Sequence, residues 1–190
     1  MGDVGDARID GFLVGLDGGG FGAFRQIAAQ AFAIAYPART EKLALVDTTA
    51  WYGAEAPKAW KERADQAAAK GLKSLMNFQV DRWFSGDFAK ENPAVAANLG
   101  AIFCDNDIKC YQATCEMLGS ADLRGGLGGL KMPTAVIVGE EDYATPVAMA
   151  EQLHGAIKGS TLDVIKKGRH LTPVQCPAEI GGFIRELAKR

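Results

Sequence analysis

The chain has 190 residues, 48% of them hydrophobic, with 21 basic and 23 acidic side chains. This length and hydrophobic content predict one folded domain over residues 1–190 and exclude a disordered chain. The net charge of −2 is spread without long runs, which excludes nucleic acid and anionic membranes as partners bound through charge. Residues 1–10 lack the pattern of a signal peptide, and no apolar run approaches the ~18 residues of a membrane span, so we expect a cytoplasmic protein.

The cysteines do not have the spacing of a metal site. They form no Cys-x-x-Cys pair and have no cluster of histidines beside them, which argues against zinc. We therefore expect no metal and no other cofactor, and interpret the cysteines as small core residues of a reduced protein. They are Cys104, Cys110, Cys115 and Cys176.

The first elements in chain order predict a strand, a tight turn and a helix. The apolar strand Gly11–Gly15 leads into a glycine-rich turn, and apolar residues then recur at helical spacing until Tyr36-Pro37 ends the helix. A second apolar run, residues 43–47, is typical of a parallel strand buried on both faces. These elements predict two parallel strands joined by a crossover helix.

The remainder of the chain predicts a helical insertion followed by more of the same sheet. Residues 54–123 contain no runs of β-branched residues, and their composition predicts several short helices. Strands are predicted over 133–139 and 161–165, with helices after Pro146 and Pro177. The predicted fold class is α/β, a parallel four-stranded sheet with an inserted helical cap.

Three polar segments follow predicted strands, at the sheet edge where open parallel sheets bind ligands. Gly15-Leu16-Asp17-Gly18-Gly19 has the form of a nucleophile elbow, Gly-x-Ser-x-Gly, with a carboxylate in place of the serine. Asp142 lies after the third strand and His170 after the fourth. A nucleophile, an imidazole that moves its proton and a carboxylate that orients the imidazole form a catalytic triad, so we take Asp17, Asp142 and His170 as catalytic candidates.

Several separate segments, in the same order along the chain, match one family of hydrolases. They are Asp47–Gly53, Trp60–Arg63, Arg82–Phe84, Tyr111 with Cys115, Ala121–Arg124, Pro133–Pro146, and His170-Leu171 with Pro177. On these segments the chain from Gly11 onward resembles the later two thirds of an α/β-hydrolase, and is most similar to the 3-oxoadipate enol-lactonase group.

The resemblance implies roles for the candidate residues. Asp142 would be the triad acid, His170 the triad base, and residues 54–123 the cap over the substrate. Trp51, Trp83 and Tyr143 are candidates for the substrate pocket. His154 is interpreted as a surface residue, because it falls on the solvent side of a predicted helix.

Two departures from the family leave the function open. Family members begin with four further strands, one of whose loops supplies part of the oxyanion hole, so the resemblance implies a truncated relative whose elbow offers only the Gly18 N–H. Asp17 resembles the nucleophile of dehalogenases and epoxide hydrolases, which attack an alkyl carbon, although haloalkane dehalogenases usually place a tryptophan at the position of Gly18. Asp17 could instead be an inactive residue that caps the next helix.

We therefore keep two functions from different classes. One is a hydrolase of a small ester, lactone or alkyl substrate, and the other is an inactive homologue that acts in binding or assembly. A third reading, dinucleotide binding, rests on Gly18–Ala23, which fits Gly-x-Gly-x-x-Gly/Ala after a strand. Its expected acidic residue is displaced, since Asp47 lies 29 positions beyond Gly18.

The first strand also predicts a partner. Phe12-Leu13-Val14 is short and apolar and lacks the lysine, proline or bulge that blunts an exposed sheet edge. We expect a homodimer in which the strand Gly11–Gly15 pairs with its own copy about a two-fold axis. Apolar faces of the next helix, including Phe21, Phe24 and Phe32, would bury against that copy.

Overall fold

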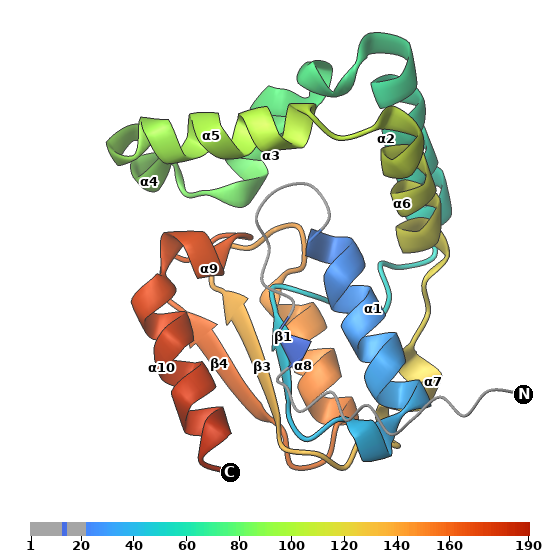
Figure 1. The fold of residues 1–190 in the computed structure, drawn as a ribbon, viewed down its shortest axis with the longest axis vertical. Helices are drawn as coiled ribbons and strands as arrows, with labels where there is room; N and C mark the ends of the chain where they lie inside the picture. Colours follow the sequence, from blue (N-terminus) through green and yellow to red (C-terminus); the bar gives the residue numbers. More distant parts are fainter. Residues whose placement is uncertain (1–12, 15–21) are drawn as a thin grey trace, which may run out of the picture.

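The computed structural model describes residues 13–14 and 22–190 (Figure 1). Its described strands are β1 (Leu13–Val14), β2 (Leu43–Val46), β3 (Thr134–Gly139) and β4 (Thr161–Ile165). They form one sheet in the order β1-β2-β3-β4, and every neighbouring pair is parallel. The predicted parallel four-stranded sheet is confirmed, with strands within a few residues of the expected ranges.

Helices connect these strands and cover the sheet. The predicted crossover helix is α1, which ends one residue before Tyr36, and prolines open or precede the helices after β3 and β4, as expected. The described helices are α1 (Gly22–Ala35), α2 (Ala56–Lys70), α3 (Met76–Trp83), α4 (Gly86–Glu91), α5 (Pro93–Cys104), α6 (Ile108–Ser120), α7 (Arg124–Leu127), α8 (Val147–Ala156), α9 (Thr172–Gln175) and α10 (Pro177–Ala188), with 3-10 turns at Pro37–Arg39 and Leu72–Leu75.

The two faces of the sheet have separate cores because successive side chains of a strand point to opposite faces. Leu43 and Leu45 of β2 pack with residues of α1 and α8 on one face. Ala44 and Val46 pack with residues of α10 on the other. Both faces of β2 and β3 are fully covered, which explains the unbroken apolar runs in their sequences.

The helices α2 to α6 form a cap above the sheet edge at which the parallel strands end (Figure 1). Aromatic side chains hold its core, with Trp83 edge-on to Phe84 and Phe103, and Phe103 edge-on to Tyr111. The chain enters and leaves the cap side by side, because Leu123 N–H donates to the carbonyl of Ala50 at 2.9 Å. These helices fall within residues 54–123. That residues 1–190 form a single domain with this insertion stays a prediction.

The cysteines are only partly the core residues that were expected. Cys115 is buried in the cap core, and Cys176 is partly buried beside α10. The expectation is wrong for Cys104 and Cys110, which are exposed because they lie on the solvent sides of α5 and α6. Among the described helices, none has the length and apolar character needed to cross a membrane.

Candidate active site

The structure brings Asp142 and His170 into direct contact. Both residues follow the ends of neighbouring parallel strands, β3 and β4, so their loops meet at one edge of the sheet. The distance between His170 Nδ1 and Asp142 Oδ2 is 2.8 Å. Gly139, the last residue of β3, makes this approach close, because a Cβ there would lie 2.4 Å from the carbonyl oxygen of Gly168.

Asp142 is held as an ionised acceptor. The N–H groups of Ala144 and Thr145 donate to its Oδ1 at 2.7 and 3.0 Å, and the Thr145 hydroxyl donates to Oδ2 at 2.8 Å. Burial opposes ionisation, but the charge and hydrogen bond of His170 and the bonds from Thr145 outweigh it and lower the pKa of Asp142. An ionised Asp142 requires the proton of His170 on Nδ1, which leaves Nε2 to accept a proton.

Asp47 is a second buried carboxylate at this edge, and the sequence reasoning assigned it no role at the site. It lies directly after β2 with a φ of 48°, in the left-handed region. Its Oδ1 accepts from Gly139 N–H at 3.1 Å, and its Oδ2 accepts from the N–H and hydroxyl of Thr172 at 2.9 and 2.6 Å. Burial first, and then the charge of Asp142, raise the pKa of Asp47 well above its ordinary value, although these hydrogen bonds act against the shift. Asp47 thereby joins the ends of β2 and β3 to the loop of His170.

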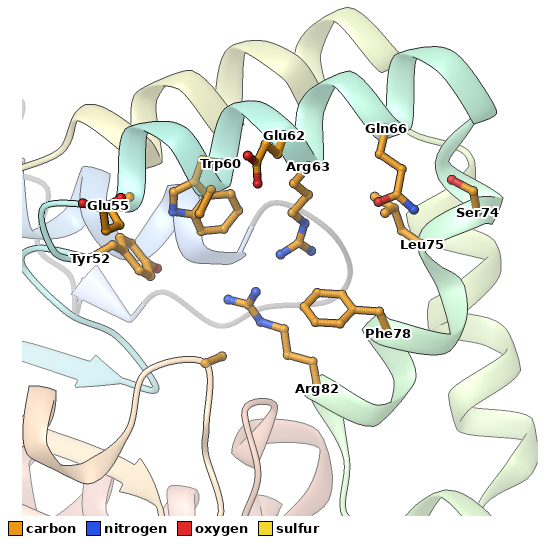
Figure 2. A pocket seen from close by; sticks show the side chains of 13 residues that line it. Tyr52, Glu55, Trp60, Glu62, Arg63, Gln66, Ser74, Leu75, Phe78 and Arg82 are labelled. Carbon is orange, nitrogen blue, oxygen red and sulfur yellow. The ribbon is translucent and has the colours of Figure 1, made fainter.

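A pocket of about 590 Å³ opens under the cap. Figure 2 shows side chains from α2 and α3 converging on it, with the guanidinium groups of Arg63 and Arg82 pointing toward one another. Ala144, whose N–H donates to Asp142, also lines the pocket, which therefore borders the loop of Asp142, although neither Asp142 nor His170 is among its lining residues. Its lining comprises Tyr52, Glu55, Ala56, Ala59, Trp60, Glu62, Arg63, Gln66, Ser74, Leu75, Phe78, Arg82 and Ala144.

The two arginines of this pocket differ in their partners. Arg63 donates to the Tyr111 hydroxyl at 2.7 Å and to Oε1 of Gln79. Arg82 is buried, and among the described residues it has neither an ion pair nor a hydrogen bond, only the face of the Trp60 ring at 5.7 Å. Burial, and then the charge of Arg63, lower the pKa of Arg82 to about 10, so it remains a cation at neutral pH. The burial of Arg82 cannot be predicted from the sequence. Arg82 lies in the segment Arg82–Phe84, which matches the hydrolase family, but the sequence predicts no function for it.

The three residues proposed from the sequence as pocket candidates lie elsewhere. Trp83 is buried in the cap core, and half-exposed Tyr143 donates its hydroxyl hydrogen to Asp81 at 2.9 Å. Trp51 lines a smaller pocket of about 360 Å³ near α7 and α8, where the Arg124 guanidinium lies 3.7 Å from its ring centre. None of the three lines the pocket under the cap.

The predicted elbow lies outside the described residues, so the structure does not test the roles predicted for it. This concerns Gly15, Asp17, Gly18 and Gly19. The catalytic assignment of Asp17, Asp142 and His170 stays a prediction. His154 is exposed on α8, as expected, and its Nδ1 lies 2.9 Å from the Ser160 hydroxyl.

Comparison with known proteins relates the chain to hydrolases. It is 30% identical over 164 residues to 3-oxoadipate enol-lactonase 2 of Acinetobacter baylyi, a match that covers 86% of this chain and 60% of the relative. It is 28% identical over 132 residues to 3-oxoadipate enol-lactonase 1 of the same organism, covering 67% of this chain and 49% of the relative. No protein-family profile matches the chain.

Solved structures agree with the fold. The enol-lactonase from Burkholderia xenovorans superposes with a TM-score of 0.84 at 27% identity, covering 88% of this chain and 64% of that one. A hydrolase from Pseudomonas aeruginosa superposes with a TM-score of 0.80 at 24% identity, over 87% of this chain and 62% of that one. These matches therefore span between 49% and 64% of the lengths of the relatives.

Proposed function

Since this chain has an α/β-hydrolase fold and is similar to 3-oxoadipate enol-lactonases, we propose that it hydrolyses small esters or lactones that carry a free carboxylate. One observation carries the proposal. The pocket beside the loop of Asp142 contains a buried guanidinium, that of Arg82, which forms neither an ion pair nor a hydrogen bond with the described residues and is only partly compensated by the more distant charge of Asp142. An anionic substrate would complete that arrangement.

The carboxylate requirement follows from the energetics of Arg82. A buried charge without a partner costs several kcal/mol, even after relaxation and water penetration. A planar guanidinium matches a carboxylate in geometry and can bind it through two parallel hydrogen bonds. The enol-lactone of 3-oxoadipate fits this description chemically, because one of the two carboxyl groups of the acid forms the lactone and the other stays free.

The acid–base pair supplies the proton transfers. Asp142 holds the Nδ1 proton of His170, so Nε2 can take a proton from an attacking water and return it to the leaving oxygen. Asp142 also stabilises the imidazolium that forms between these steps. On an ester or lactone, Asp17 is a poor nucleophile because its attack would give an anhydride. We therefore assign the attack to a water activated by His170.

A second substrate class is favoured by Asp17 itself. A carboxylate is a suitable nucleophile toward an alkyl carbon, where it would displace a leaving group and form an ester on the enzyme. Water activated by His170 would then hydrolyse that ester. The alternative in which the chain binds small carboxylates without turnover also rests on Asp17, because its negative charge opposes a developing oxyanion.

Matched substrates test the proposal directly. Mono-4-nitrophenyl glutarate and 4-nitrophenyl pentanoate have acyl chains of equal length, but only the first ends in a carboxylate. We expect a kcat/KM at least about tenfold higher for the glutarate ester, a preference lost in Arg82→Met, because a hydrogen bond to a charged group contributes ~1.5–3 kcal/mol. His170→Ala should abolish hydrolysis of both esters.

The alternatives predict other results. Turnover of a small haloacid that disappears in Asp17→Asn would identify the alkyl-carbon reaction. An inactive binding protein would hydrolyse neither ester but would still bind glutarate, and Asp17→Ser should then raise esterase activity. Equal rates for the two esters in the wild-type chain and in Arg82→Met would refute the carboxylate requirement.

A further inference from the structure

One cap carboxylate, Asp81 of α3, contacts both the loop that carries Asp142 and the loop that carries His170. The Tyr143 hydroxyl donates to Asp81 Oδ2 at 2.9 Å. Arg169 Nη1 donates to the carbonyl oxygen of Asp81 at 2.7 Å and to its Oδ1 at 3.2 Å. Tyr143 directly follows Asp142, and Arg169 directly precedes His170. Asp81 therefore holds the chain neighbours of both members of the acid–base pair.

The residues after Asp81 continue this attachment. Leu171 N–H donates to the carbonyl oxygen of Trp83 at 3.0 Å. The Gln175 side chain donates to the Ser85 hydroxyl at 3.1 Å and accepts from Ser85 N–H at 3.4 Å. The cap segment 81–85 is thus bonded to the loop of His170 on both sides of Arg82.

Arg169 depends on Asp81 for much of its pairing. Its side chain is 20% exposed, and its Nε is buried without a hydrogen-bond partner. The guanidinium lies over the Tyr143 ring at 5.4 Å, and Glu141 is 3.8 Å from Nη2, farther than the contacts with Asp81. Loss of the Asp81 carboxylate would remove the shorter of the two ion pairs of this cation, leaving Glu141 as its ion-pair partner beside the bond to the Asp81 carbonyl and the contact with the Tyr143 ring.

We propose that Asp81 is a positioning residue that holds Arg82 in fixed register with the Asp142–His170 pair. Arg82 neighbours Asp81 in the chain and points into the pocket, so the bonds of Asp81 set the distance between a bound anion and the acid–base pair (Figure 2). Fixed register matters because small displacements of a bound substrate reduce reaction rates strongly. That the anion bound by Arg82 is a substrate carboxylate rests on the proposed function, whereas the effect of Asp81 on His170 does not.

The first test needs no ligand or activity. The chain has two histidines, His154 and His170, so ring resonances of labelled protein can be assigned from His154→Gln. In Asp81→Asn, we expect the His170 Cε1–Hε1 resonance to shift and broaden and the His154 resonance to stay in place. Tyr143→Phe, which changes no charge at neutral pH, should act in the same direction. Asp65→Asn removes an exposed carboxylate of the cap, paired with Lys61, and should move neither resonance.

Two results would overturn the role of Asp81. One is a His170 resonance in Asp81→Asn that matches the wild type. The other is a double variant, Asp81→Asn with Tyr143→Phe, whose change equals the two single changes added, because independent groups add and coupled groups do not. A double variant no more affected than the stronger single variant supports the proposal.

The second test uses glutarate and the matched esters. In Asp81→Asn, we expect glutarate to bind still, through Arg82, while the kcat for the glutarate ester falls about tenfold and that for the pentanoate ester changes less. An equal loss of kcat on both esters would contradict the proposal that Asp81 fixes the position of Arg82 relative to the Asp142–His170 pair. Failure of wild-type chain to bind glutarate would instead refute the proposed function, and the ligand-free test of Asp81 would stand unaffected.

Discussion

Arg82→Met should make the protein more stable and abolish its binding of carboxylates. The fall in the pKa of Arg82 from its ordinary value to about 10 corresponds to about 3 kcal/mol of penalty on the charged form, at ~1.4 kcal/mol per pH unit. Methionine removes that penalty and keeps a flexible apolar side chain beside Trp60. It also loses the cation–π contact with that ring, which contributes about 1–2 kcal/mol.

The net expected gain is about 1–2 kcal/mol in the free energy of unfolding. For a chain of this size, that gain raises Tm by roughly 2–8 °C. Thermal unfolding followed by circular dichroism, in a chloride buffer free of carboxylates, measures the shift. Glutarate should raise the Tm of the wild-type chain and leave that of Arg82→Met unchanged, because only a ligand that binds the folded state stabilises it.

Arg63→Met is the matched control, because the same substitution removes an arginine that has partners. It leaves the buried Tyr111 hydroxyl and Gln79 amide without their donor, so stability should fall by about 2 kcal/mol or more. The prediction is that the two substitutions change stability in opposite directions, an increase for Arg82→Met and a decrease for Arg63→Met. A drop in Tm for Arg82→Met similar to that for Arg63→Met would refute the reasoning, since it would mean that Arg82 has a stabilising partner in the folded protein.

Three further outcomes are expected. Gly139→Ala should destabilise the fold and lower any hydrolytic activity, because its Cβ would meet the backbone oxygen of Gly168 at 2.4 Å; activity and Tm equal to wild type would contradict this packing. The raised pKa of Asp47 means that its folded form keeps the proton to a higher pH than its unfolded form, so its contribution to stability is present at low pH and is lost as pH rises through the raised value; urea midpoints measured across pH should fall less steeply in Asp47→Asn. Finally, β1 has a neighbour on one side only within the described sheet, and Phe24 is 42% exposed, so we propose that β1 pairs with a second copy; light scattering should give a dimer that Leu13→Pro disrupts, and a monomer of about 20 kDa would exclude it.

Local sequence patterns were sufficient to predict the elements of the fold. Unbroken apolar runs gave β2 and β3, because strands covered on both faces carry apolar side chains at every position. Prolines marked helix boundaries because proline restricts the residue before it and lacks an N–H to donate. The alternation of strands and helices then required a parallel sheet, and the order of Asp142 and His170 after successive strands was enough to predict that they share one edge.

Only the tertiary structure decided the state of individual side chains, because burial and pairing depend on residues far apart in the chain. Asp47 is bonded to Thr172, 125 positions away, and Asp81 to Arg169, 88 positions away. In the sequence Arg82 is one of 21 basic residues, and only its position in the pocket lined by α2 and α3 buries it without an ion pair among the described residues. Trp83 shows the converse, since its neighbour Arg82 faces the pocket while the indole fills the cap core. Helical geometry directs adjacent side chains about 100° apart, so the placement of one helix assigns one residue to the site and the next to the core.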